Sequence, residues 1–228
     1  MIGRRRRSDE RVLPIETALR PMRGRLHGLL GQMTKAFEGV ERRRVMFVSP
    51  EHGDGTTTIA ACAALMLIRH FRRDVALVEA NLFSPALGGY LGIGAGPGLI
   101  DVLDGSVEPQ AAVRNSKVDG LYVVTAGGQR ESEDGELATA RLRELIDQVS
   151  SEHRYTIVDA PPILEHPETC LLLEDVDEVF LVVRAGATLQ ERAREAIQVL
   201  EDAGISVGGV FLNRYRPHLP LGLDRWLR

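Results

Sequence analysis

The stretch from Arg44 to His70 decides the fold: RVMFVS (44–49), PEHGDG (50–55) and TTTIAACAALMLIRH (56–70). The first part is a short apolar run, and the last has apolar residues at helical spacing behind threonines that favour a helix start. We therefore predict a strand, a tight loop and a helix. Because Gly53 and Gly55 have no Cβ, backbone N–H groups can close around an anion at the positive end of the helix dipole. The segment is a candidate phosphate-binding loop.

This loop departs from the Walker A pattern, G-x-x-x-x-G-K-[ST], in which the lysine neutralises phosphate and the hydroxyl holds Mg²⁺. Aligned on Gly55, the loop has Pro50 at the first-glycine place and Thr56 at the lysine place, while Thr57 keeps the hydroxyl. The chain contains two lysines, Lys35 and Lys117, and neither lies in the loop. An ordinary strand-to-helix turn is the alternative interpretation.

Composition indicates a globular protein with one sizeable core. The chain has 228 residues, of which 44% are hydrophobic and 26% charged, enough for one α/β domain and an arm. No apolar run has the length of a membrane span, and the basic block at 4–7 has no apolar stretch behind it. We expect a cytoplasmic location. The two cysteines, Cys62 and Cys170, lie among apolar residues without metal-ligand spacing, so we expect them to fill the core.

Charge is divided unevenly along the chain. Residues 1–44 hold 12 Lys and Arg against 5 Asp and Glu, a net of +7, which leaves 45–228 with a net of −11. Such an arm can contact nucleic acid, an anionic membrane or the acidic body of another copy. Apolar residues at helical spacing predict amphipathic helix within 15–37. The tail 217–228 mixes leucines, tryptophan and arginines, which suits a membrane interface, a partner groove or packing on its own domain.

Apolar runs alternate with helical patterns through the rest of the chain. We predict parallel strands near 44–49, 74–79, 121–125, 155–159, 178–184 and 208–212, and helices after several of them, including 136–150 and a helix closed by Gly204. The glycine-rich passage 88–105 is expected to be irregular until GLIDVL (98–103), a short helix. This order predicts a doubly wound, mainly parallel α/β sheet. We divide the chain into an arm (1–40), one domain (41–216) and a tail (217–228).

Three ordered segments resemble the P-loop ATPase domains of bacterial tyrosine kinases (BY-kinases) that control capsule and exopolysaccharide synthesis, relatives of MinD/ParA-type ATPases. SPEHGDGTTT (49–58) lies where that family has its Walker A loop, VALVEANLFSPAL (75–87) where it has Walker A prime, and YTIVDAPPIL (155–164) where it has Walker B. FLNR (211–214) is similar to a strand end whose asparagine faces adenine. The resemblance implies a P-loop NTPase fold and ATP or ADP with Mg²⁺ as cofactor.

The resemblance also implies site residues. It makes Thr57 and Asp159 the metal-side groups and Asn213 the adenine contact, with Asp159 and Glu79 as the candidate catalytic carboxylates. The cofactor would lie on the P-loop and the start of its helix, at Gly53, Asp54, Gly55, Thr56, Thr57 and Thr58.

The departures from the family pattern fall at catalytic positions. Thr56 replaces the phosphate lysine, Glu79 and Asn81 replace the two Walker A prime aspartates, and Phe83 replaces the arginine. Neutral Asn81 cannot act as a base. The family's C-terminal tyrosine cluster is reduced to Tyr215, and its subunit-contact motif keeps Arg20 and Arg23 but has Thr17 at the glutamate place.

Three hypotheses of function follow. The first is a regulator of capsule or exopolysaccharide synthesis with impaired or lost phosphotransfer, which acts with a membrane polysaccharide co-polymerase or chain-length-determinant adaptor at the inner face of the membrane. It would form homo-oligomers and have no nucleic-acid partner. The second is an active ATPase or tyrosine autokinase in which an arginine from another subunit supplies the missing charge. The third is a dinucleotide-binding oxidoreductase, with Glu79 accepting from a ribose hydroxyl.

Overall fold

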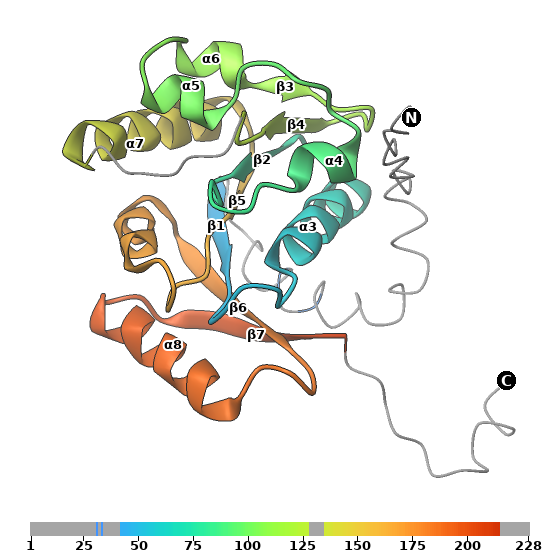
Figure 1. Ribbon diagram of the computed structural model, residues 1–228. Coiled ribbons are helices and arrows are strands. Elements are labelled where there is room, and N and C mark those ends of the chain that lie inside the picture. Colours follow the sequence, from blue (N-terminus) through green and yellow to red (C-terminus); the bar gives the residue numbers. More distant parts are fainter. Residues whose placement is uncertain (1–30, 32, 34–41, 128–134, 215–228) are drawn as a thin grey trace, which may run out of the picture.

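The computed structural model describes residues 31, 33, 42–127 and 135–214, with the backbone alone for 135–139. In this part, one seven-stranded sheet has the order β3-β4-β2-β5-β1-β6-β7 (Figure 1). Every pairing is parallel except that of β3 with β4. The strands are β1 (Arg43–Val48), β2 (Val75–Glu79), β3 (Arg114–Asn115), β4 (Leu121–Val124), β5 (Tyr155–Asp159), β6 (Glu178–Arg184) and β7 (Val207–Asn213).

Helices cover both faces of the sheet. The 16-residue helix α3 (Thr56–Phe71) and the short α4 (Leu87–Leu91) pack on one face. The other face is covered by α5 (Leu99–Leu103), α6 (Pro109–Ala112), α7 (Gly135–Glu152), the 3₁₀ helix η2 (Pro167–Asp175) and α8 (Gln190–Asp202). Figure 1 shows α3 and α7 on opposite sides of the strands.

The central strands are apolar at almost every position because both of their faces are buried. In β1, Val45 and Phe47 face the core under α3, whereas Met46 and Val48 face the core under α5, α7 and α8. All four side chains are 0% exposed. β1 lies between β5 and β6, so the loop that follows it begins at the middle of the sheet.

The six predicted strands and the doubly wound, mainly parallel sheet are confirmed, with boundaries within one residue. Four elements were missed: the antiparallel edge strand β3, the helix η2 and the helices α4 and α6. The expectation of an irregular chain before the predicted 98–103 helix was wrong, because LGGYL (87–91) forms α4. The carboxylate of Glu79 accepts hydrogen bonds from the backbone N–H groups of Ala86 and Leu87, which satisfies the helix start despite two helical glycines.

The arm and the tail fall mostly outside the described residues. Gly31 and Met33 are helical, and Met33 is fully buried in the core under α3, as expected for a docked amphipathic segment. The remainder of the predicted 15–37 helix, and the whole 217–228 tail, are not described. Across the described ranges, the helices are too short or too polar to span a bilayer.

Aromatic packing beneath the P-loop supplies a test of the core. Phe180 is fully buried, and its ring lies 5.5 Å from that of Phe47 and 5.2 Å from that of Phe211. We expect Phe180→Ala to lower the free energy of unfolding by about 3–5 kcal/mol in urea denaturation. Tyr90→Ala, at a 44% exposed aromatic residue, is the matched control and should cost less than about 1 kcal/mol. Equal losses would contradict the assigned core.

Candidate functional site

The loop between β1 and α3 has the backbone that the glycine spacing predicts. Gly53 and Gly55 have φ values of 89° and 94°, in the left-handed region that favours glycine. Gly55 is the N-cap of α3, with no side-chain cap and no acidic residue in the first turn. The first N–H groups of a 16-residue helix are therefore available to an anion.

The side-chain amide of Asn213, at the end of β7, forms a hydrogen bond to this loop. Its Nδ2 donates to the backbone oxygen of Asp54 at 2.7 Å, and its Oδ1 accepts from the N–H of Arg214 at 2.8 Å. A Cβ added to Gly55 would lie only 2.2 Å from Nδ2 of Asn213. The glycine is thus required twice, by its φ and by this contact. The adenine contact predicted for Asn213 stays a prediction.

The two acidic side chains of the loop, Glu51 and Asp54, each bond to a residue outside it. Asp54 is 4% exposed, and its Oδ1 accepts a 2.6 Å hydrogen bond from the hydroxyl of Thr188. Burial raises the pKa of Asp54, and the Thr188 hydroxyl opposes that rise. Glu51 forms a 2.7 Å ion pair with Arg192 of α8. Both carboxylates therefore have structural roles.

Asp159 ends β5 next to the loop. It pairs in register with Phe47 on β1 and with Glu79 on β2, so it lies at the carboxyl edge of the three central strands. The residue is 0% exposed, and neither carboxylate oxygen has a hydrogen-bond partner in the described part of the chain. Native proteins seldom leave a buried polar group unpaired, so this carboxylate is suited to a cation or a bound water.

The environment of Asp159 favours its neutral form. Burial raises its pKa to about 7, the nearby hydroxyl of Thr57 acts in the opposite direction, and the negative charge of Glu79 adds to the rise. Thr57 is the second residue of α3 and is half-buried. The two groups predicted to serve a metal therefore do lie together. Mg²⁺ prefers such oxygen ligands, and the pair fits it.

Glu79, the other predicted catalytic carboxylate, is fully engaged by backbone donors. Its Oε1 accepts from the N–H groups of Ala86 and Leu87, both at 2.5 Å, and its Oε2 accepts from the N–H of Ala126 at 2.9 Å. Glu79 therefore ties the end of β2 to α4 and to the end of β4.

The three threonines and Asn81 complete the cradle. Thr56, at the lysine place, is 7% exposed, and Thr58 is half-buried beside it on α3. Asn81 is 8% exposed, and its Oδ1 accepts from the N–H of Ser84 at 3.2 Å. The backbone N–H of Asn81 donates to the carbonyl of Asp159 at 3.1 Å. The structure thus brings together every predicted site residue at one edge of the sheet.

Sequence reasoning missed the contacts between the three loops at this edge. The rings of Phe83 and His166 stack at 3.6 Å with an interplanar angle of 13°, which joins the loops after β2 and β5. Glu165 accepts from the N–H of His52 at 2.6 Å, which joins the loop after β5 to the P-loop. An aromatic residue at the family's arginine place was the available signal for the stacked pair.

A cavity of about 310 Å³ opens beside Glu79, between α4 and the ends of β2 and β4. Its wall includes Pro85, Ile93, Thr125 and several glycines. The sequence patterns did not predict this cavity, whose lining includes five glycines and three alanines. The described residues hold no cluster of three His, Cys, Asp or Glu side chains suited to a metal.

Comparison with known sequences supports the predicted resemblance. The chain is 28% identical to EpsB of Ralstonia solanacearum over 193 residues, 24% identical to the tyrosine-protein kinase ptk of Acinetobacter johnsonii over 196, and 24% identical to the tyrosine-protein kinase CpsD of Streptococcus agalactiae serotype III over 179. The matches cover 85%, 86% and 78% of this chain. The same matches span 26% of EpsB and of ptk, and 77% of CpsD. No protein-family model matches.

Solved structures agree on the fold. The VpsO kinase domain has a TM-score of 0.76 at 27% identity, covering 90% of this chain and 100% of that one. The kinase domain of Escherichia coli Etk has 0.79 at 21%, covering 96% and 87%. MinD of Pyrococcus horikoshii, solved with Mg-ADP, has 0.65 at 24%, covering 82% and 77%. The chain is therefore similar to BY-kinase domains in sequence and fold, and to MinD in fold.

The contact between Gly55 and Asn213 supplies one test. Gly53 and Gly55 share a left-handed φ, but a Cβ on Gly53 would meet no atom within 4 Å. We expect Gly53→Ala to cost about 1 kcal/mol of unfolding free energy through backbone strain, and Gly55→Ala about 1–2 kcal/mol more through loss of the Asn213 hydrogen bond. In an Asn213→Ala background the two losses should become equal. A persistent difference would contradict this contact.

The buried carboxylate predicts an unusual pH dependence. Because the pKa of Asp159 is raised to about 7 on folding, the folded state binds more protons than the unfolded state between about pH 4 and 7, so this group lowers stability as pH rises. Asp159→Asn should therefore raise the free energy of unfolding at pH 8, by on the order of 4 kcal/mol at most. The gain should shrink toward pH 5.

Urea denaturation of both proteins from pH 5 to 8 measures this difference. Exposed Asp104→Asn is the control and should leave the pH profile of the parent unchanged. A gain for Asp159→Asn that is constant with pH would contradict a carboxylate with a raised pKa.

Proposed function

We propose that this chain is a BY-kinase-like domain that binds adenine nucleotide with Mg²⁺ but transfers phosphate slowly or not at all, and that it serves as a regulator of capsule or exopolysaccharide assembly. The observation that best supports this proposal is that some features of the site are kept while another is replaced. The anion-binding loop and the unpaired Asp159 carboxylate are kept, while the lysine place holds buried Thr56.

Retention of binding is supported by the geometry of the cradle. The uncapped start of α3 offers N–H groups to phosphate, and Thr57 with Asp159 offers oxygen atoms to Mg²⁺. Bound Mg²⁺ would neutralise phosphate charge and favour the ionised form of Asp159. Residues of this chain would orient the phosphates through the backbone at Gly53 and Gly55.

Impaired transfer is supported by the charges that surround the cradle. Residues 49–58 contain no lysine or arginine but contain Glu51 and Asp54. Asn81 is neutral and has its oxygen engaged by the N–H of Ser84. Phosphoryl transfer depends on positioned cations, and the loss of one such contact typically lowers the rate 10²–10³-fold. An arginine supplied by another subunit is the alternative that this account must exclude.

The proposal also includes a role as a regulator of capsule or exopolysaccharide assembly. Resemblance to BY-kinases suggests a membrane polysaccharide co-polymerase or chain-length-determinant adaptor as partner, a position at the inner face of the membrane, and homo-oligomers. The dinucleotide-binding alternative has less support, since Glu79 is 1% exposed and accepts three backbone hydrogen bonds.

Calorimetric titration with Mg·ADP and Mg·ATP, followed by an assay of phosphate release, tests the proposal. We expect saturable binding and no turnover beyond that of Asp159→Ala. Absence of binding would contradict the proposal. Turnover comparable to that of intact kinases and abolished by Asp159→Ala would establish a compensating arginine instead.

Restoring the missing cation gives a sharper prediction. Thr56→Lys places an ammonium where the family has one, so we expect Mg·ATP to bind about 10–100-fold more tightly, the magnitude of a charge-assisted hydrogen bond. Thr58→Lys adds the same charge two residues further along α3, and we expect it to tighten Mg·ATP binding less than about 3-fold. Equal gains would indicate general attraction and contradict a preserved cradle at Thr56.

A further inference from the structure

Arginines gather at the end of the sheet opposite the P-loop. The strands β2, β5 and β1 are adjacent there, and Val75, Tyr155 and Arg43 occupy matching register positions. Arg73 precedes β2 by two residues and Arg154 directly precedes β5. Because neighbouring strands lie about 4.8 Å apart, the entries to β2 and β1 are separated by roughly 10 Å.

Helix α3 adds further charge at the same place. Its last turn carries Arg69 and His70, and its C-cap is Arg72. Arg72 has a φ of 51°, the left-handed conformation that is common at helix C-termini, and its cation lies at the negative end of the helix dipole. We call the exposed group the basic edge: Arg42, Arg69, His70, Arg72 and Arg73.

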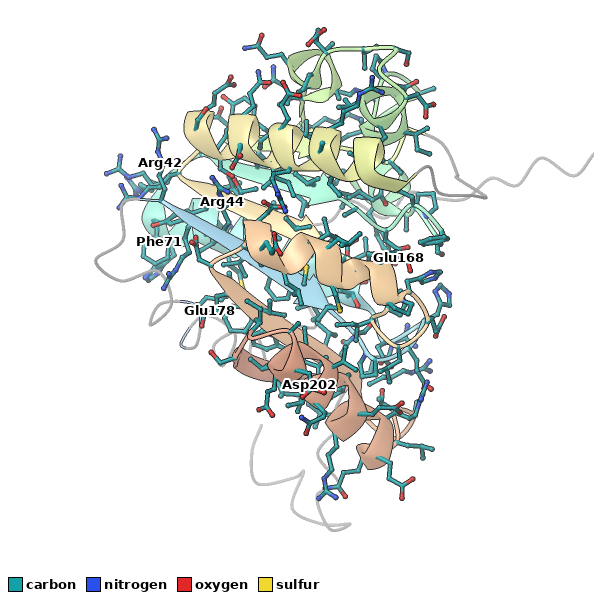
Figure 2. The ribbon with its side chains drawn as sticks, turned by 90° about the vertical axis from the view of Figure 1, so that its left-hand side faces the viewer. Arg42, Arg44, Phe71, Glu168, Glu178 and Asp202 are labelled. Carbon is teal, nitrogen blue, oxygen red and sulfur yellow. The ribbon has the colours of Figure 1, made fainter. Side chains whose placement is uncertain are left out.

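The basic edge has one acidic neighbour in the sequence, exposed Asp74, which directly follows Arg73. Arg44 pairs with Asp147 at 2.7 Å and Arg43 approaches Glu178 at 4.0 Å. By contrast, the four arginines of the basic edge form no ion pair with any described residue. Figure 2 shows Arg42, Arg44 and Phe71 together at one end of the molecule and Glu168 at the other.

We propose that the basic edge docks on an anionic lipid surface. Its charges are spread over the ends of three strands and one helix, which suits a plane of many headgroups. Residues 1–44, which lead into β1 at this edge, carry a net +7. Residues 45–228 carry a net −11, so an anionic membrane attracts this end and repels the rest.

Two other partners fit less well. A nucleic acid would meet the net negative body beyond a narrow basic contact. For a second copy, two carboxylates at the opposite end are already engaged: Glu51 is paired with Arg192, and Glu168 lies 3.0 Å from Nδ1 of His166. A lipid surface presents many anionic headgroups at once. Docking in this way leaves the P-loop, at the far edge of the sheet, open to nucleotide and protein partners.

Co-sedimentation of the full chain with lipid vesicles tests this inference without nucleotide. The variant is Arg69→Ala, Arg72→Ala and Arg73→Ala combined. Its matched control removes three other exposed cations, Lys117→Ala, Arg194→Ala and Arg214→Ala. Arg214 has a φ of 54°, so each triple variant replaces one arginine whose backbone is in the left-handed region. Thermal unfolding and far-ultraviolet circular dichroism establish that both variants fold.

We expect the parent to pellet with phosphatidylcholine vesicles that contain phosphatidylglycerol, and not with phosphatidylcholine alone. Removal of the three edge arginines should lower the partition coefficient roughly 100-fold, whereas the control should change it less than about 5-fold. Higher salt should weaken binding of the parent. Equal losses in the two variants would overturn the inference. Unchanged pelleting of the edge variant, with loss of self-association or of DNA binding instead, would also overturn it.

Discussion

A buried carboxylate without a hydrogen-bond partner, Asp159, is the constraint around which the site is built. The residue lies at the carboxyl end of β5, between β1 and β2, and is 0% exposed. Leaving such a group unpaired costs free energy, so the fold carries a local instability at the same point as the P-loop. A group that binds the Asp159 carboxylate would offset this cost. In the free chain the same cost raises the pKa of Asp159.

The surrounding loops are rigidly joined by contacts that do not involve a ligand. Asn213 and Thr188 hold the P-loop from β7 and the region before α8, and Glu165 holds it from the loop after β5. Glu79 joins β2 to α4 and to the end of β4. At places where the resemblance implies charged groups, Thr56 and Asn81 are neutral, and Glu79 accepts three backbone hydrogen bonds. The loops around the cradle are therefore held together without a ligand, and residues 49–58 contain no lysine or arginine.

Much of this architecture could be predicted from the sequence. Apolar runs such as Val75–Val78 are buried on both faces, so they identify central parallel strands without help from tertiary context. Closely spaced Gly53 and Gly55 identified the loop, and a carboxylate ahead of Pro161 and Pro162 identified the end of β5. What failed depended on contacts between distant segments. The helix α4 forms over two glycines because the Glu79 carboxylate caps its start, and no local pattern contains that information.

The side-chain roles were harder to predict than the positions. The adenine contact of Asn213 and the catalytic role of Glu79 stay predictions, and the structure adds contacts that the sequence did not indicate: the amide of Asn213 bonds to the loop, and Glu79 accepts three backbone hydrogen bonds. The most direct test is the ionisation of Asp159, followed by the ¹³C resonance of its side-chain carboxyl and assigned by its loss in Asp159→Asn. Without Mg²⁺ this resonance should titrate with a midpoint near pH 7. A midpoint near pH 4, the ordinary value for a solvated aspartate, would contradict the account.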